Sequence, residues 1–232
     1  MKYIVKSSEP ISLTTYSSTP NANFDDCNKD EIRSSLIQEQ GAICAYCMQR
    51  ISNEWDNKLR KFKTEIEHYK SQDKFPELSL KYSNMLGVCN GNAGKPIHKQ
   101  HCDKSKDFDK HKSFLPLTIN PQNQNCEKLI EYKPSGKIFS QNEIINRDLD
   151  IILNLNEPDL VNNRKKAIDL AVQSIINSIP KNRKNQDWNL SDIKKEKEKW
   201  KTLYNSEYRP FCQAVIYFLE KRINRKLKAN NQ

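Results

Sequence analysis

The chain has 232 residues, of which 36% are hydrophobic and 29% are charged, and its mean hydropathy is −0.88. No segment approaches the roughly 20 consecutive apolar residues that a membrane span needs, so the composition indicates a wet, soluble surface and excludes a membrane protein. The first residues lack the apolar run and the small-residue cleavage site of a secretory signal, and we therefore expect a cytoplasmic protein.

The formal net charge is +10, and most of the excess lies near the C-terminus. Residues 181–232 contain fourteen Lys and Arg against six Asp and Glu. Such a concentration fits a surface that faces phosphates, and it fits equally well a set of solvated, lysine-rich helices. Charge alone therefore leaves both interpretations open.

The first part of the chain predicts an irregular arm followed by a helix. Residues 1–28 mix short apolar pieces with Ser, Thr, Pro and Asn, which is typical of an extended arm. Residues 29–40 carry apolar side chains at helical spacing and end before Gly41, a good signal for the end of a helix.

The next part predicts two short strands, a loop and a helix. Residues 62–68 alternate between side chains in the manner of a strand, and residues 82–89 predict a second strand with its lead-in turn. Residues 90–101 are rich in Gly, Pro and Asn and predict a loop. The charged segment from Cys102 onward predicts the start of a helix.

The remainder predicts a hairpin and three helices. Residues 128–132 and 137–139 resemble two strands joined by a Pro-Ser-Gly turn. Apolar residues recur every three or four positions from Leu160 to Ile179, which predicts a helix that Pro180 stops. Two more helices are expected, one over residues 191–204 with Ser191 or Asp192 as its cap, and one with a basic end over residues 209–227.

The seven cysteines are an odd number in a reducing compartment, which argues against a disulfide framework. Four of them have the order of a structural zinc site: Cys44, Cys47, Cys89 and Cys102. A Cys-x-x-Cys turn lets two thiolates meet one tetrahedral zinc ion, and a second pair from later in the chain closes the site. Twelve residues separate the last two cysteines, so His101 or His98 could replace Cys102 as the fourth ligand. The alternative is a set of packed free thiols, as we expect for Cys27, Cys126 and Cys212.

Within this cysteine frame lie four residues suited to hydrolysis of a phosphodiester. Such a reaction with one divalent metal needs ligands for the cation, a base for the attacking water and a group that orients the base. Glu67 and Asp103 are hard oxygen donors suited to Mg²⁺ or Mn²⁺. The imidazole of His68 titrates near neutrality and can act as the base, and the amide of Asn84 can orient it.

At these residues the chain resembles the HNH endonuclease superfamily, whose pattern runs Cys-x-x-Cys, acid-His, Asn-Leu, Cys and Cys-His-x-x-Lys. Two departures matter. Asp103 stands where the family usually has its last His, and the spacing from Cys89 to Cys102 is longer than the usual two residues. The resemblance implies a zinc-stabilised ββα-metal core, which gives an α+β, mainly helical fold. We therefore expect an N-terminal arm and helix over residues 1–40, the core over 41–132, and a hairpin and basic helical region over 133–232.

The similarity is greater to one branch of that superfamily. The segments GAICAYCMQRI, IEHYKSQ, YSNMLGVCNGN, HCDKSK and INPQNQNCEKLIEY, which span residues 41–132, resemble the PtuB-like HNH proteins of Septu antiphage systems and of some retrons. The resemblance implies an ABC-type ATPase partner related to PtuA and, beside retrons, a reverse transcriptase with its small DNA. It also implies defence against phage through damage to nucleic acid.

These expectations lead to a nuclease in which Lys104, Lys106 and the C-terminal helices hold the phosphates that flank the cleaved bond. Two alternatives stay open. The target could be RNA, such as a tRNA, in place of DNA. The chain could also be a non-catalytic zinc module that binds nucleic acid or the ATPase, although such a module would not need Glu67, His68 and Asp103.

Overall fold

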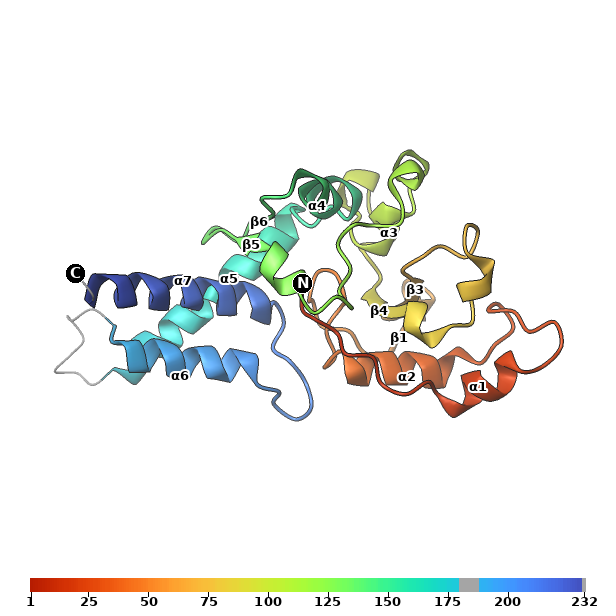
Figure 1. Cartoon of the computed structure of the whole chain (residues 1–232), viewed down its shortest axis with the longest axis horizontal. Helices are drawn as coiled ribbons and strands as arrows, with labels where there is room; N and C mark the ends of the chain where they lie inside the picture. The colour runs from red at the N-terminus through yellow and green to blue at the C-terminus, as the bar shows by residue number, and fades with distance from the viewer. Residues whose placement is uncertain (180–187, 231–232) are drawn as a thin grey trace.

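The computed structural model describes residues 1–179 and 188–230 and has an α+β fold with small antiparallel sheets. Three long helices lie at one end of the molecule: α5 (Pro158–Ser178), α6 (Leu190–Lys201) and α7 (Cys212–Asn230) (Figure 1). The strands between residues 55 and 89 and the N-terminal helices lie toward the other end (Figure 1). Pro180, the predicted helix stop, lies outside the described residues.

The N-terminal region contains two helices. Helix α2 (Lys29–Glu39) begins at Asn28, whose side chain accepts a hydrogen bond from the backbone N–H of Asp30, and it confirms the predicted helix. The helix ends at Glu39 with Gln40 as its cap, and the next residue, Gly41, has a φ of +58°, where a Cβ would lie 2.5 Å from the ring of Tyr208. The prediction of an irregular arm is wrong in part, because α1 (Ile11–Ser17) forms within it.

The two predicted strands pair as an antiparallel hairpin. Strand β3 (Thr64–His68) lies beside β4 (Met85–Cys89), with Glu67 opposite Leu86 and His68 opposite Met85. The short helix α3 (Asp103–Lys106) follows Cys102, so the order strand, strand, helix is as predicted. A smaller hairpin, β1 (Trp55–Asp56) and β2 (Lys61–Phe62), precedes β3.

A third hairpin joins the strand region to the long helices. Strands β5 (Glu131–Tyr132) and β6 (Ile138–Phe139) are shorter than predicted but pair as expected. Helix α4 (Glu143–Arg147) and a π-helical turn (Asp148–Ile152) follow, and neither was predicted. The buried carboxylate of Asp148 accepts hydrogen bonds from the backbone N–H groups of residues 118 and 119, which fixes this turn against the preceding chain.

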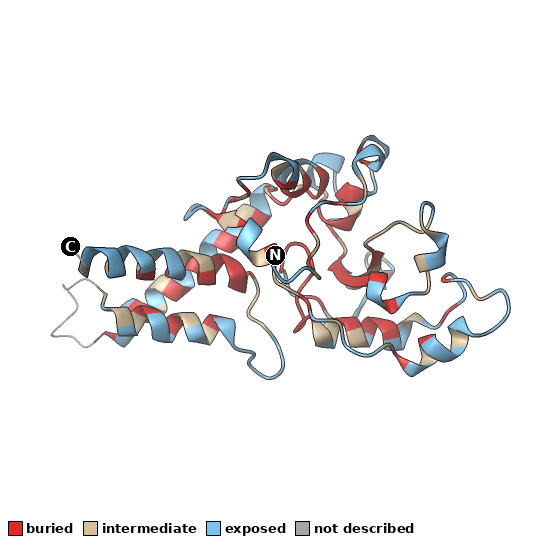
Figure 2. Ribbon diagram, viewed as in Figure 1, coloured by how far each residue is buried: buried red, intermediate tan, exposed pale blue. Residues whose placement is uncertain are grey.

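The three C-terminal helices pack on one another, and their buried faces point inward (Figure 2). The predicted helix over residues 160–179 is confirmed as α5. Helix α6 is capped by Asn189, whose side chain accepts from Asp192 N–H, so neither Ser191 nor Asp192 is the cap. Helix α7 begins at Cys212, three residues later than predicted.

The other helical segments are 3₁₀ turns: Pro76–Leu78, Tyr82–Asn84, Ile97–Lys99, Asp109–Phe114 and Cys126–Leu129. The main apolar core runs from Met1 through β4 and the cysteine cluster to Ile223 in α7. Among the described helices, none combines the length and the apolarity that crossing a membrane requires.

Candidate functional site

The first cysteine pair lies on a tight turn between α2 and β1. The backbone N–H of Cys44 donates to Gln49 and that of Met48 donates to Cys44, while Met48 itself has a φ of +65°. The N–H of Ala45 donates to the carbonyl of Gly87, which fixes the turn beside β4. The turn therefore presents Cys44 and Cys47 toward the end of β4, where Cys89 lies.

The four predicted cysteines come together as a single buried cluster. The sulfur atoms of Cys44, Cys47, Cys89 and Cys102 lie within 4.8 Å of one another. Two of the separations are 3.9 Å, between Cys44 and Cys102, and 3.7 Å, between Cys47 and Cys89. A tetrahedral zinc ion with bonds of about 2.3 Å requires sulfur atoms about 3.8 Å apart. The cluster can therefore hold a metal ion such as zinc.

The thiols influence one another's ionisation. Burial alone would raise the pKa of Cys44, but hydrogen bonds from the thiols of Cys102, Cys47 and Cys89 hold that pKa well below its usual value. A thiolate in such a ring is the form that binds a metal.

The fourth position of the cluster belongs to Cys102 in this structure. Its thiol completes the sulfur set, whereas Nδ1 of His101 lies outside that set, 3.2 Å from the sulfur of Cys102 and 4.0 Å from that of Cys89. His98 is exposed on the preceding loop. The sequence had left these three residues as alternatives, and the geometry favours Cys102.

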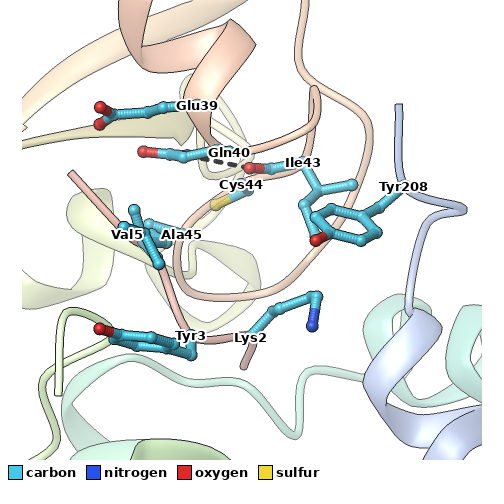
Figure 3. Close-up of a pocket in the computed structure, with 10 residues that line it drawn as sticks. Lys2, Tyr3, Val5, Glu39, Gln40, Ile43, Cys44, Ala45 and Tyr208 are labelled. Carbon is cyan, nitrogen blue, oxygen red and sulfur yellow. Dashed lines mark hydrogen bonds between the residues drawn. The ribbon is translucent and has the colours of Figure 1, made fainter. Parts of the chain in front are cut away.

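Residues of the N-terminal arm and of α2 surround the cysteine turn (Figure 3). The side-chain amide of Gln40 donates to the carbonyl of Ile43 at 2.9 Å and to that of Gly87 at 2.7 Å, and it accepts from Gly87 N–H. Lys2, Tyr3 and Val5 lie across the turn from Gln40 (Figure 3). The cavity of about 130 Å³ that these residues line is almost free of acidic side chains and lies apart from the acidic site described next.

A second, acidic site lies at the end of β3. Glu67 on β3 and Asp103 at the start of α3 are both buried, and their carboxyl groups lie within hydrogen-bonding reach of each other. Glu67 also accepts a hydrogen bond from the phenol of Tyr46 at 2.9 Å and forms an ion pair with Lys106. Tyr46 lies between the two cysteines of the turn, so the turn directly braces one carboxylate of the acidic site.

The two carboxyl groups differ in their affinity for a proton. Burial and the negative charge of Asp103 raise the pKa of Glu67 well above its usual value. Burial also acts on Asp103, but a hydrogen bond with Glu67 and the charges of Lys106 and Lys104 outweigh it and lower the pKa of Asp103. Two buried carboxyl groups in contact favour either a shared proton or a cation between them.

His68, the predicted base, lies buried beside this pair. Its Nε2 atom is 2.8 Å from the carbonyl oxygen of Ser79, and its ring meets that of Phe24 edge to face, with centroids 4.4 Å apart. Burial lowers the pKa of the imidazole, and the hydrogen bond to Ser79 only partly offsets this effect. The ring is therefore neutral at pH 7.

The expected role of Asn84 needs correction. Its amide does not bond to the imidazole: Nδ2 donates to the carbonyls of Lys70 at 3.0 Å and Leu78 at 3.3 Å, and Oδ1 accepts from Lys70 N–H at 2.9 Å. These bonds brace the loop between β3 and β4, which carries Ser79. The contact to the imidazole comes instead from the backbone carbonyl of Ser79, which no sequence motif identified.

The two predicted phosphate-binding lysines have different environments. The ammonium group of Lys106 is buried, where it pairs with Glu67 and donates to the carbonyl of His68 at 3.1 Å, so the prediction that Lys106 holds a phosphate is not supported by its position. Lys104 is partly exposed and pairs with Glu65 at 2.6 Å. The two side chains project to opposite sides of a short helix, which explains the difference.

One cavity connects the acidic pair with the imidazole. Glu67, His68, Asp103 and Lys106 line an open cavity of about 250 Å³, together with side chains of the β3–β4 loop. The cavity therefore brings together three of the four predicted catalytic residues, Glu67, His68 and Asp103, whereas Asn84 does not line it.

No protein-family model matches the chain, and no curated protein matches its sequence significantly.

Proposed function

We propose that the chain is a metal-dependent HNH-type endonuclease that hydrolyses nucleic-acid phosphodiester bonds. The observation that carries the proposal is the joint placement of His68, Glu67 and Asp103 around one cavity, with the cysteine cluster braced against Glu67 through Tyr46. A zinc module that only binds a partner has no use for a buried carboxylate pair beside a neutral imidazole.

His68 is suited to act as the general base. A backbone carbonyl only accepts hydrogen bonds, so a neutral imidazole that bonds to Ser79 must carry its proton on Nε2. Nδ1 then holds the free lone pair, and it makes no hydrogen bond with any residue that the structure describes. This lone pair takes the proton from the attacking water.

Glu67 and Asp103 are the residues that would hold Mg²⁺ or Mn²⁺. Both are oxygen donors, they lie in contact, and in their present arrangement the Lys106 ammonium supplies the positive charge at Glu67. Mg²⁺ or Mn²⁺ bound there would stabilise the negative charge that develops on the phosphate and the leaving oxygen. Glu67 therefore already faces a positive charge, which supports the proposal that the carboxylate pair can hold a divalent cation.

We further propose the biological setting that the PtuB-like resemblance implies. In it the chain is the effector of an antiphage system with an ABC-type ATPase related to PtuA, accompanied in retrons by a reverse transcriptase and its small DNA. The excess of positive charge in residues 181–232 supports contact with a polyanion. DNA is the proposed substrate and tRNA or another RNA is the alternative.

The test of the activity is cleavage of labelled nucleic acid by the purified chain, alone and with its ATPase, with Mg²⁺, with Mn²⁺ and with EDTA. Cleavage must require a divalent ion and must be lost in His68→Ala, while the content of bound zinc stays the same. If wild type and His68→Ala behave alike, the catalytic assignment fails and the non-catalytic zinc module becomes the better interpretation.

The substrate is tested in the same assay. Labelled duplex DNA, single-stranded DNA and total tRNA are offered in parallel at equal phosphate concentration. Cleavage of DNA alone supports the proposed substrate, and cleavage of tRNA alone transfers the proposal to RNA.

A further inference from the structure

A second hollow, which we call the hairpin groove, lies next to the acidic cavity. Its volume is about 470 Å³, and its lining includes Trp55 and Phe62 of the β1–β2 hairpin together with Arg60 and Lys61. Ile66 of β3 lines both the groove and the acidic cavity. The groove and the acidic cavity therefore adjoin at this residue.

Phe24 forms the physical link between the two hollows. Its side chain lines the hairpin groove, and its ring contacts the ring of His68 edge to face. A ligand that fills the groove up to Phe24 thus contacts the ring that packs directly against the imidazole of His68.

The groove offers an aromatic surface that the protein leaves uncovered. The indole of Trp55 contacts Phe62 edge to face, with centroids 5.2 Å apart, yet Trp55 remains 50% exposed. Behind it, the guanidinium of Arg33 lies 3.8 Å from the centre of the Phe62 ring and holds that ring in place. A tryptophan that served only to close the hairpin would bury more of its surface, so its open face is available for stacking.

The charge of the groove is strongly positive. Five cations line it, at positions 29, 33, 60, 61 and 104, against the single carboxylate of Glu65. Glu65 pairs with Lys61 and Lys104, whereas Arg60 is exposed and has no ion-pair partner in the part of the chain that the structure describes. The groove thus combines the guanidinium of Arg60, which is available to bind phosphate, with the exposed indole of Trp55. Such a pair of groups binds the phosphates and bases of a nucleic-acid strand.

We infer that the hairpin groove binds a single-stranded segment of nucleic acid, with one base stacked on Trp55 and its backbone phosphates held by Arg60 and neighbouring lysines. Bases within a duplex already stack on each other, so only an unpaired base can use the indole. The inference rests on the proposed nuclease function and adds to it the form of the substrate: a strand that is unpaired beside the cleaved bond.

The experiment measures binding without cleavage. The full-length chain carrying His68→Ala is titrated, without divalent ions, into fluorescein-labelled oligothymidine and oligouridine of about 12 nucleotides and into a mixed-sequence DNA duplex. Fluorescence anisotropy gives the dissociation constants over a series of salt concentrations. The oligothymidine and oligouridine arms distinguish DNA from RNA as the source of the strand.

Trp55→Ala is expected to weaken binding of a single strand by about 5- to 100-fold, and Trp55→Phe to retain most of the affinity because it keeps an aromatic face. Arg60→Ala is expected to reduce the slope of log affinity against log salt by about 0.7. Lys58→Ala is the matched control, since Lys58 is exposed in the same hairpin loop but does not line the groove. It should change affinity little.

The inference is overturned if Trp55→Ala binds single strands as wild type does, if it weakens duplex and single strand equally, or if neither oligonucleotide binds. Zinc content and melting temperature of each variant show whether it has kept its fold, and Trp55→Phe with Arg60→Ala provides the test if Trp55→Ala does not fold. Failure of the nuclease proposal is distinguishable: binding would still depend on Trp55 while no metal-dependent cleavage is found.

Discussion

The carbonyl oxygen of Ser79 lies 2.8 Å from Nε2 of His68, and this contact leaves Nδ1 as the nitrogen that would act in the proposed role of base. Ser79 belongs to the loop between β3 and β4, and Asn84 braces that loop at Lys70 and Leu78. The orientation of the imidazole therefore depends on the backbone of this loop, and the side-chain amide of Asn84 holds that backbone in place.

This relationship predicts that Asn84→Ala impairs catalysis without removing a catalytic group. Release of the loop would move the Ser79 carbonyl and misplace the ring, and a displacement of about 1 Å can lower a rate about 100-fold. We expect a loss of that order in kcat with little change in KM, and an acid limb of the pH profile that moves to lower pH, because the hydrogen bond to Ser79 raises the pKa of the ring.

The control is Asn156, which braces the β5–β6 hairpin in the same manner by donating to and accepting from the backbone of Ile138. Asn156→Ala should lower the melting temperature but leave kcat unchanged. If the two variants lose activity in parallel with stability, Asn84 has only a structural role.

The neutral imidazole predicts a specific pH dependence. Because burial lowers the pKa of His68, the ring stays neutral and active below its ordinary value of 6.5, and cleavage falls only as the pH drops through the lowered pKa. Single-turnover rates between pH 4.5 and pH 8, at saturating metal, measure this limb. The same shift makes the folded state lose stability as the pH falls below 6.5, because the unfolded chain binds the proton more readily.

An NMR titration of the His68 imidazole in the metal-free protein gives the pKa independently of the rate. A limb and a titration midpoint that both lie above 6.5 would contradict the buried, neutral base.

The cysteine cluster predicts about one zinc ion for each chain. Cys89→Ser and Cys102→Ser are expected to lose that ion and to lower the melting temperature, because a metal bound by the four cysteines would join the cysteine turn, β4 and the start of α3. Elemental analysis after gel filtration measures the content, and removal by a chelator should reproduce the loss in wild type.

Two controls make this prediction specific. His101→Gln should retain the ion, since the ring lies outside the sulfur set, and Cys27→Ser should retain it as well, because Cys27 packs in the separate core beside α1 and α2. Loss of zinc in His101→Gln together with retention in Cys102→Ser would assign the fourth position to the histidine.

Much of the strand and helix pattern could be predicted because it depends on periodicity. The alternation in β3 and the three- to four-residue spacing in α5 arise because one face of each element is buried. Apolar residue types mark that buried face in the sequence. Helix α1 escaped prediction because it has seven residues, begins after Pro10 and is rich in Ser and Thr, which are weak helix formers. Its only buried side chain is Leu13, so no periodic face exists to detect.

The acidic site could be predicted in its residue types but not in its contacts. The Ser79 carbonyl has no sequence signature, because every residue carries one. The role of Tyr46 could have been suspected from its place between Cys44 and Cys47, although the reach of its hydroxyl to Glu67 depends on how the turn packs on β4. Two lysines two positions apart cannot be told apart until the helix that carries them is placed.

That difference between Lys106 and Lys104 gives the last prediction. Lys106 has a side chain that is 3% exposed and neutralises Glu67, so Lys106→Ala leaves a buried carboxyl group without its partner and should lower the free energy of unfolding by about 3 kcal/mol. Lys104 has a side chain that is 26% exposed, and Lys104→Ala should lower it by about 1 kcal/mol or less. Urea denaturation of the zinc-loaded proteins, without Mg²⁺ or Mn²⁺, measures both values. Equal effects of the two substitutions would mean that the buried ion pair contributes no more than a surface one, and the picture of Lys106 as the resident cation of the acidic site would have to be abandoned.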